Sequence, residues 1–174
     1  TASLALLTGT VDEDGVPNGI AGGIGDVAGA VTVAGGSVTS LFNSGADAPL
    51  TYALSLTTIA TLSALNLTSG GAALSYVLVG DTVTASANGA AVFTFQVSAA
   101  GAYTFTLIDQ LDHATGADEN DLLISLGGII TATDADGDLV TAAANGLVIT
   151  VDDDTPTASL ALLTGTVDED GVPN

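Results

Sequence analysis

The chain has 174 residues, with 20 Asp or Glu, one His and neither Lys nor Arg, so its formal net charge is −20. Without basic side chains it cannot neutralise phosphate groups, which excludes nucleic acid as a partner and disfavours binding to an anionic membrane surface. Its hydrophobic content of 47% separates it from disordered acidic chains, and its length is sufficient to bury a core, so we expect a globular domain.

The first predicted element is an extended strand over 2–10, followed by an acidic run of Asp12, Glu13 and Asp14. At about 3.3 Å per residue, such a strand carries the chain roughly 30 Å, which is about the length of a domain. The end of the domain where the chain enters is called the N-terminal pole below, and the opposite end the C-terminal pole. We therefore expect the acidic run at the C-terminal pole.

The middle of the chain predicts short strands separated by turns. Residues 22–27, GGIGDV, lack the spacing of a calcium or phosphate loop, so we expect a glycine-rich turn. The segments 50–56, 92–97 and 102–108 have the composition and alternation of strands. The segment 57–65, TTIATLSAL, comes nearest to a helix, but its Thr content favours a strand. Short strands at regular spacing predict an all-β domain, an Ig-like β-sandwich.

A second acidic segment covers 109–121 and precedes a predicted strand over 122–133 with an irregularity at Gly127 and Gly128. The hairpin described below would place Asp134 and Asp138 at the C-terminal pole. Because the strand over 122–133 would lead from the acidic segment to Asp134, we expect the acidic segment at the opposite, N-terminal pole. Its candidate ligand residues are Asp109, Asp112, Asp118 and Glu119. We interpret the single histidine, His113, as a loop residue, since nothing in the sequence resembles a nucleophile elbow.

The last part of the domain contains two further acidic clusters and a turn signal. Asn145-Gly146 predicts a tight hairpin between strands 139–143 and 147–151, which would place Asp138 beside Asp152 or Asp153. The first cluster, in DADGD, resembles the start of a calcium loop but lacks the Glu at the twelfth position of an EF-hand. The two clusters consist of Asp134, Asp136 and Asp138, and of Asp152, Asp153 and Asp154.

The acidic residues are concentrated in these clusters, and only Asp26, Asp47 and Asp81 lie between Gly15 and Ile108. Clustered carboxylates without basic partners favour a cation from solution, and Ca²⁺ takes six to eight oxygen ligands. We therefore expect a calcium-stabilised domain that binds several Ca²⁺ ions. The alternative for each cluster is a solvated polar loop.

The sequence TASLALLTGTVDEDGVPN occupies residues 1–18 and returns at 157–174, which defines a repeat period of 156 residues (157 − 1). A period of this length is the size of a domain. We predict that 1–156 form one complete repeat, with a linker near 152–156, and that 157–174 are the first strand of the next, identical repeat. The second copy adds the candidate ligands Asp168, Glu169 and Asp170, so that acids from neighbouring repeats converge on each junction.

The residue inventory argues against catalysis and membrane insertion. Paired carboxylates can hydrolyse glycosides, but the chain has no Trp and only four Phe and three Tyr to bind a sugar. Its apolar runs are interrupted well before the length of a membrane span. We expect a non-catalytic protein without a small-molecule substrate and without direct membrane insertion.

The segment DQLDHATGADENDLLISLGGIITATDADGDLV, with VITVDDDTPTA after it and VDEDGVPNG near the start, resembles tandem repeats of giant repeats-in-toxin (RTX) adhesins. The resemblance is strongest over 109–156 and 11–19 and does not include 20–90. It implies a calcium-stabilised extender on the surface of a Gram-negative bacterium, exported by type I secretion, whose partners are neighbouring identical repeats. The alternative is a cadherin-like or glycan-binding module in which the repeat itself contacts a partner.

Overall fold

Two layers of β-strands form the domain in the computed structural model, which describes residues 1–3, 5–116, 119–156, 158 and 162–165. One layer is a five-stranded antiparallel sheet with the order β2-β9-β8-β7-β6. Its strands are β2 (Val33–Ser37), β6 (Ser75–Val79), β7 (Thr82–Ala87), β8 (Ala90–Val97) and β9 (Ala102–Leu107). The predicted all-β sandwich is confirmed, and so are the strands predicted over 92–97 and 102–108.

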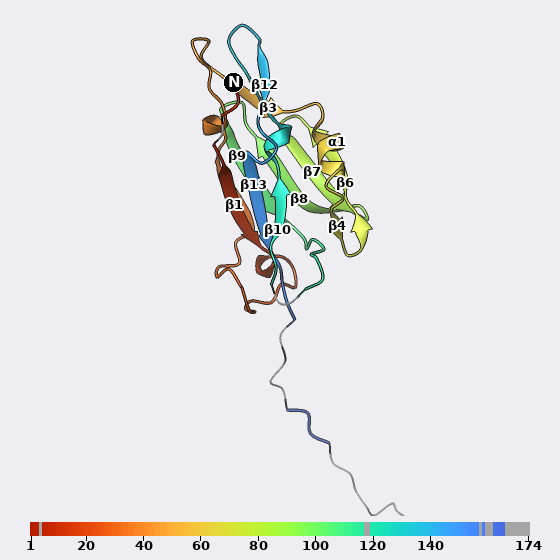
Figure 1. Ribbon diagram of the computed structural model, residues 1–174. Helices are drawn as coiled ribbons and strands as arrows, with labels where there is room; N and C mark the ends of the chain where they lie inside the picture. The colour runs from red at the N-terminus through yellow and green to blue at the C-terminus, as the bar shows by residue number, and fades with distance from the viewer. Residues whose placement is uncertain (4, 117–118, 157, 159–161, 166–174) are drawn as a thin grey trace, which may run out of the picture.

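Two three-stranded sheets complete the sandwich, with the orders β1-β13-β10 and β12-β11-β3 (Figure 1). Their strands are β1 (Leu7–Asp12), β3 (Thr51–Leu54), β10 (Leu122–Ser125), β11 (Ile130–Thr133), β12 (Leu139–Thr141) and β13 (Leu147–Asp152). The smaller elements are η1 (Glu13–Gly15), η2 (Thr39–Leu41), α1 (Thr58–Ser63), the hairpin of β4 (Thr68–Ser69) and β5 (Ala72–Ala73), and η3 (Gly127–Ile129).

The core lies between the layers because alternate residues of each strand point inward. Phe93 of β8 and Phe105 of β9 stack with ring centroids 5.0 Å apart. Ile149 of β13 and Ile124 of β10 are likewise inaccessible to solvent. In β13 the buried positions alternate with half-buried ones up to Val151, so the strand is held by packing along its whole length.

The segment 57–65 contains the helix α1, so the prediction of a strand there is wrong. Thr58 and Leu62, one helical turn apart, are both fully buried. The Thr58 hydroxyl donates a hydrogen bond to the Ser55 carbonyl oxygen at 2.6 Å. Tertiary packing and this local bond outweigh the weak preference of Thr for strands.

The predicted hairpin between 139–143 and 147–151 is also wrong. β12 pairs instead with β11, in the register Leu139↔Thr133, while β13 pairs with β1 and β10. The turn that closes the hairpin of β11 and β12 is DADGD itself, where Gly137 adopts a positive φ of 101° that suits glycine. Asp138 therefore does not lie beside Asp152.

The first and last strands of the domain run side by side, and this arrangement defines its two poles. β1 is parallel to β13, with Asp12 opposite Asp152, so both acidic runs reach the C-terminal pole as predicted. The strand is shorter than expected at its start, because residues 1–3 bond to the backbone of 41–43 instead. The N-terminus and the end of β13 lie at opposite ends of the domain (Figure 1).

The described residues of the acidic loop, 109–116 and 119–121, lie at the C-terminal pole, so the predicted place of this loop at the N-terminal pole is wrong. β10 is antiparallel to β13, with Leu122 opposite Val151, so the loop that precedes β10 arrives beside the end of β13. From there the chain passes through η3 into β11 and reaches Asp134, which lines a pocket together with Thr1 at the N-terminal pole. The predicted irregularity at Gly127 and Gly128 is this η3 turn, where the chain leaves one sheet for the other.

Gly127 and Gly128 offer a matched test of the η3 turn. A Cβ at Gly127 would overlap the carbonyl oxygen of Ala143, whereas one at Gly128 would meet its nearest atom at 3.5 Å. We expect Gly127→Ala to lower the free energy of unfolding by about 2 kcal/mol or more, since backbone must move, and Gly128→Ala to change it by less than about 1 kcal/mol. Urea unfolding of both variants measures the difference, and equal losses would contradict this account of the turn.

Candidate functional site

The parallel ends of β1 and β13 present carboxylates to two sides of the C-terminal pole. Asp12 and Asp152 are partners in the register, and each is only 2% exposed. Because successive side chains of a strand point to opposite faces, the residues that follow, Glu13 and Asp153, turn the other way. The two pairs accordingly belong to two separate groups of side chains.

The first group is the carboxylate cluster, which consists of Asp12, Asp14, Asp26, Glu119 and Asp152. Carboxylate oxygens of Asp12, Asp26 and Asp152 lie within 4.8 Å of one another. Loop 20–30 folds over them and donates backbone N–H groups, from Ala30 to Asp12 Oδ2 at 3.0 Å and from Val27 to Asp152 Oδ2 at 2.7 Å. These bonds hold the carboxylates in place but satisfy only part of their acceptor capacity.

Asp14 and Glu119 each bring an oxygen that has no partner among the described residues. Asp14 Oδ1 and Glu119 Oε2 are inaccessible to solvent and accept no hydrogen bond. Gly23 allows Glu119 to approach loop 20–30, because a Cβ at this position would overlap the Glu119 carboxylate. Buried acceptors without donors are costly, so these oxygens could serve as ligands of a metal ion.

The electrostatics of the carboxylate cluster agree with its geometry. Burial, followed by the charges of neighbouring acids, raises the pKa of Asp14 and of Glu119. The pKa of Asp152 is raised by burial and by the charges of Asp121, Asp12 and Asp26. Since the chain has no Lys or Arg, these charges have no basic side chain to pair with. The cluster could therefore bind a metal ion, and its all-oxygen donor set fits a hard cation such as Ca²⁺.

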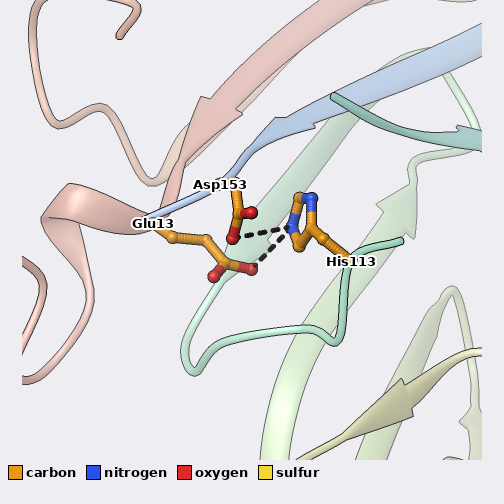
Figure 2. A group of neighbouring side chains, drawn as sticks. All are labelled: Glu13, His113 and Asp153. Atoms are coloured by element: carbon orange, nitrogen blue, oxygen red, sulfur yellow. Dashed lines mark hydrogen bonds and ion pairs between the residues drawn. The ribbon is translucent and has the colours of Figure 1, made fainter. Parts of the chain in front are cut away.

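The second group is the histidine cluster, formed by Glu13, His113 and Asp153 (Figure 2). His113 Nε2 lies 3.3 Å from Glu13 Oε1 and 4.0 Å from Asp153 Oδ1, and the side chains of His113 and Glu13 are each 3% exposed. Burial lowers the pKa of His113, but the hydrogen bond and charge of Glu13 outweigh it and raise the pKa. Burial also raises the pKa of Glu13, so both shifts favour retention of a proton by the pair.

The third group is the N-terminal-pole loop, with Asp134, Asp136 and Asp138. Asp136 and Asp138 are exposed, and Asp134 Oδ1 accepts hydrogen bonds from the N–H groups of Gly137 and Asp138 at 3.1 and 2.8 Å. The hydrogen bond with Asp136 lowers the pKa of Asp134 and raises that of Asp136. The loop is thus a self-bonded turn in which Asp134 is half-buried and the carboxylates of Asp136 and Asp138 are exposed.

The other predicted ligands have different surroundings. Asp109 and Asp154 line a pocket at the C-terminal pole together with Glu13. Asp112 anchors its loop to the β4–β5 hairpin, and hydrogen bonds from Thr68 and Gly71 lower its pKa. Asp118, Asp168, Glu169 and Asp170 lie outside the described residues. So does most of 157–174, and its assignment to a following repeat stays a prediction.

Sequence reasoning missed two residues of these groups. Asp26 is isolated along the chain, and its only signal is the glycine-rich surroundings of 22–27, which allow a loop to fold back onto the pole. His113 does lie in a loop, as predicted, but its ring is buried against two carboxylates. No sequence spacing reveals this contact, because Glu13 and Asp153 come from opposite ends of the domain.

The fold and the C-terminal pole define an all-β sandwich domain with acidic clusters able to hold metal. The chain belongs to the family described as "Domain of unknown function (DUF5801)", whose model matches residues 9–145, well over half of the sequence. Searches among curated proteins and solved structures found no match. Within the described residues, no helix has the length and apolar character needed to cross a membrane.

The raised pKa values predict how the stability of the metal-free protein depends on pH. A group whose pKa is raised on folding contributes stability that is complete below its unfolded pKa and is lost as the pH rises through its folded pKa. Asp14, Glu119 and Asp152 have this sign, and so does His113. We expect the metal-free chain to become less stable as the pH rises from about 4.5 towards 7.5.

The measurement is thermal unfolding of metal-free protein, followed by circular dichroism across this pH range. Asp81, Asp112 and Asp134 have lowered pKa values and act in the opposite direction, but the stability that they contribute is lost only as the pH falls below the ordinary Asp pKa of about 3.9, which lies below this range. A melting temperature that climbs steadily from pH 4.5 to 7.5 would show that the buried carboxylates do not govern stability.

Proposed function

We propose that this domain is a non-catalytic structural extender, a repeat of an RTX-type adhesin on a Gram-negative cell surface that is stiffened by Ca²⁺ at its C-terminal pole. The observation that carries the proposal is the carboxylate cluster, with solvent-inaccessible oxygens on Asp14 and Glu119 that lack a partner. The identical sequences of 1–18 and 157–174 and the opposite placement of the chain's entrance and exit support an array of such domains.

The ligands for calcium would come from segments far apart in the sequence. Asp12 ends β1, Asp14 lies in η1, Asp26 lies in loop 20–30, Glu119 precedes β10, and Asp152 ends β13. When bound, the ion would neutralise carboxylates that otherwise repel one another, and it would tie these segments together. Ion binding to the carboxylate cluster would stabilise the pairing of β1 with β13 and the loop 20–30 that covers the cluster.

The linker to the following repeat begins within this cluster. Asp152 is both a member of the cluster and the last residue of β13, and the Thr155 hydroxyl donates to Glu119 Oε1 at 3.2 Å. Pro156 follows, and a proline favours an extended conformation in the residue before it. An ordered cluster would therefore fix the direction in which the linker leaves the domain.

Calcium should stabilise the chain strongly. A ligand that binds only the folded state adds about 2.7 kcal/mol per site when its free concentration is a hundred times its Kd. We expect millimolar Ca²⁺ to raise the melting temperature by roughly 5 °C or more, because 1 kcal/mol corresponds to about 2–4 °C in a domain of this size, and Mg²⁺ to do much less. Equal melting temperatures with and without Ca²⁺ would overturn the proposal.

The effect of Asp26→Asn on the melting temperature should change sign when calcium is added. Without metal it removes one of the repelling charges that raise the pKa values of Asp14 and Asp152, so we expect the melting temperature to rise by a few degrees, or about 1 kcal/mol. With Ca²⁺ it removes a ligand, so the rise should turn into a loss. The control Asp81→Asn changes an exposed carboxylate bonded to Gln96 and should show no such reversal.

The extender and the adhesion module differ in what calcium does to an array. For a chain of two complete repeats, we expect small-angle X-ray scattering to give a larger maximum dimension and a narrower distribution of shapes in Ca²⁺ than in EDTA. If the dimensions do not respond to Ca²⁺ while single repeats are retained on a glycan surface, the adhesion module is the better account.

A further inference from the structure

We propose that Glu13, His113 and Asp153 form a separate site for a borderline divalent cation of the Zn²⁺ class. This inference does not depend on the extender role, and it concerns a group of side chains that differs from the carboxylate cluster by its nitrogen ligand. Calcium prefers oxygen ligands, six to eight of them, and an imidazole with two carboxylates does not supply that set. Imidazole nitrogen and carboxylate oxygen together suit Zn²⁺.

Once His113 has lost its second proton, its tautomer aims the Nε2 lone pair at the two carboxylates. His113 Nδ1 lies 2.7 Å from the carbonyl oxygen of Asn120, and since a carbonyl can only accept, Nδ1 carries a proton. In the neutral ring Nε2 is then the unprotonated nitrogen, and it faces Glu13 Oε1 and Asp153 Oδ1 (Figure 2). A backbone carbonyl on the far nitrogen is the usual arrangement that orients a metal-bound histidine.

The distances leave room for a metal ion in place of the proton that the pair shares when no metal is bound. A charge-assisted N–H···O bond between imidazolium and carboxylate is expected at about 2.7–2.9 Å, whereas Nε2 and Glu13 Oε1 are 3.3 Å apart. Two ligands at about 2.0–2.1 Å from a tetrahedral ion lie about 3.3 Å from each other. Asp153 Oδ1, at 4.0 Å, belongs to the most exposed of the three side chains, with 21% exposure, and can close the remaining gap by rotation.

Glu13 and His113 are held in place, and the site can be reached from solvent. Glu13 is buried and its Oε1 accepts the N–H of Leu111 at 2.7 Å, which fixes the carboxylate in a loop far from it in the sequence. All three side chains line a surface pocket of about 420 Å³ that also includes Thr155 and Pro156. A three-ligand site beside such a pocket leaves a fourth position for water or for a group of a partner molecule.

Because His113 is the only histidine, its ring nitrogens report on the site without any substitution. The experiment is a titration of the ¹⁵N-labelled, Ca²⁺-saturated chain with Zn²⁺, observed by imidazole NMR. We expect Nε2 to shift to the position of a metal-bound nitrogen, Nδ1 to stay protonated, and the change to saturate at one Zn²⁺ per chain. An Nε2 that remains protonated at every Zn²⁺ concentration would overturn the proposal.

Calorimetry of Zn²⁺ binding to variants locates the ion. We expect His113→Gln and Glu13→Gln each to weaken Zn²⁺ binding by about tenfold or more, since loss of a ligand should cost at least as much as loss of a supporting group. The control Asp136→Asn, in the N-terminal-pole loop, should leave affinity within about twofold. If Asp26→Asn weakens binding while His113→Gln does not, zinc occupies the carboxylate cluster and the proposal is wrong.

Glu13→Gln keeps an oxygen that can accept the Leu111 N–H, so this variant retains the loop anchor while it loses the charge. Circular dichroism in Ca²⁺ checks that each variant is folded before titration. If His113→Gln is unfolded, the NMR titration of the unsubstituted chain still decides the question.

Discussion

The parallel pairing of β1 with β13 is the constraint on which the rest of the molecule depends. It joins residues 7–12 to residues 147–152, so the first and last strands of the domain end at the same pole. Parallel strands keep equivalent positions side by side, which brings Asp12 to Asp152 and the following residues, Glu13 and Asp153, to the same end. A hairpin could not do this, because antiparallel neighbours that share a tight turn end at opposite poles.

The acidic pole results from a conflict between burial and charge. Apolar side chains such as Val11 and Val151 bury the strand ends completely, and they draw the adjacent carboxylates into the protein with them. Buried carboxylates are commonly paired with a Lys or Arg side chain, but this sequence has neither. Backbone N–H groups of loop 20–30 supply part of the compensation, and the remainder is left to a cation or to protons.

The sequence predicts those features that depend on local patterns. Alternation in 92–97 and 102–108 predicts their strands, and the extended first segment predicts the correct pole for Asp12 to Asp14, although β1 begins only at Leu7. Features that depend on the choice between distant partners were not accessible. Asn145-Gly146 is a sound turn signal, but β12 and β13 belong to different sheets, and only the packing of the whole domain determines that. The contacts of Asp26 and His113 likewise depend on the packing of the whole domain, which no local pattern predicts.

The closure of the domain by its first and last strands also affects how an array of identical repeats can fold. Strand β13 is followed, after ten residues (153–162), by another copy of the β1 sequence, which is far nearer along the chain than the β1 that it pairs with. A parallel pair needs a crossover of about a dozen residues or more, because the chain must return to the start of its neighbour. In the array proposed above, a linker of this length would therefore disfavour pairing of β13 with the following copy, and that copy would remain available to the next repeat.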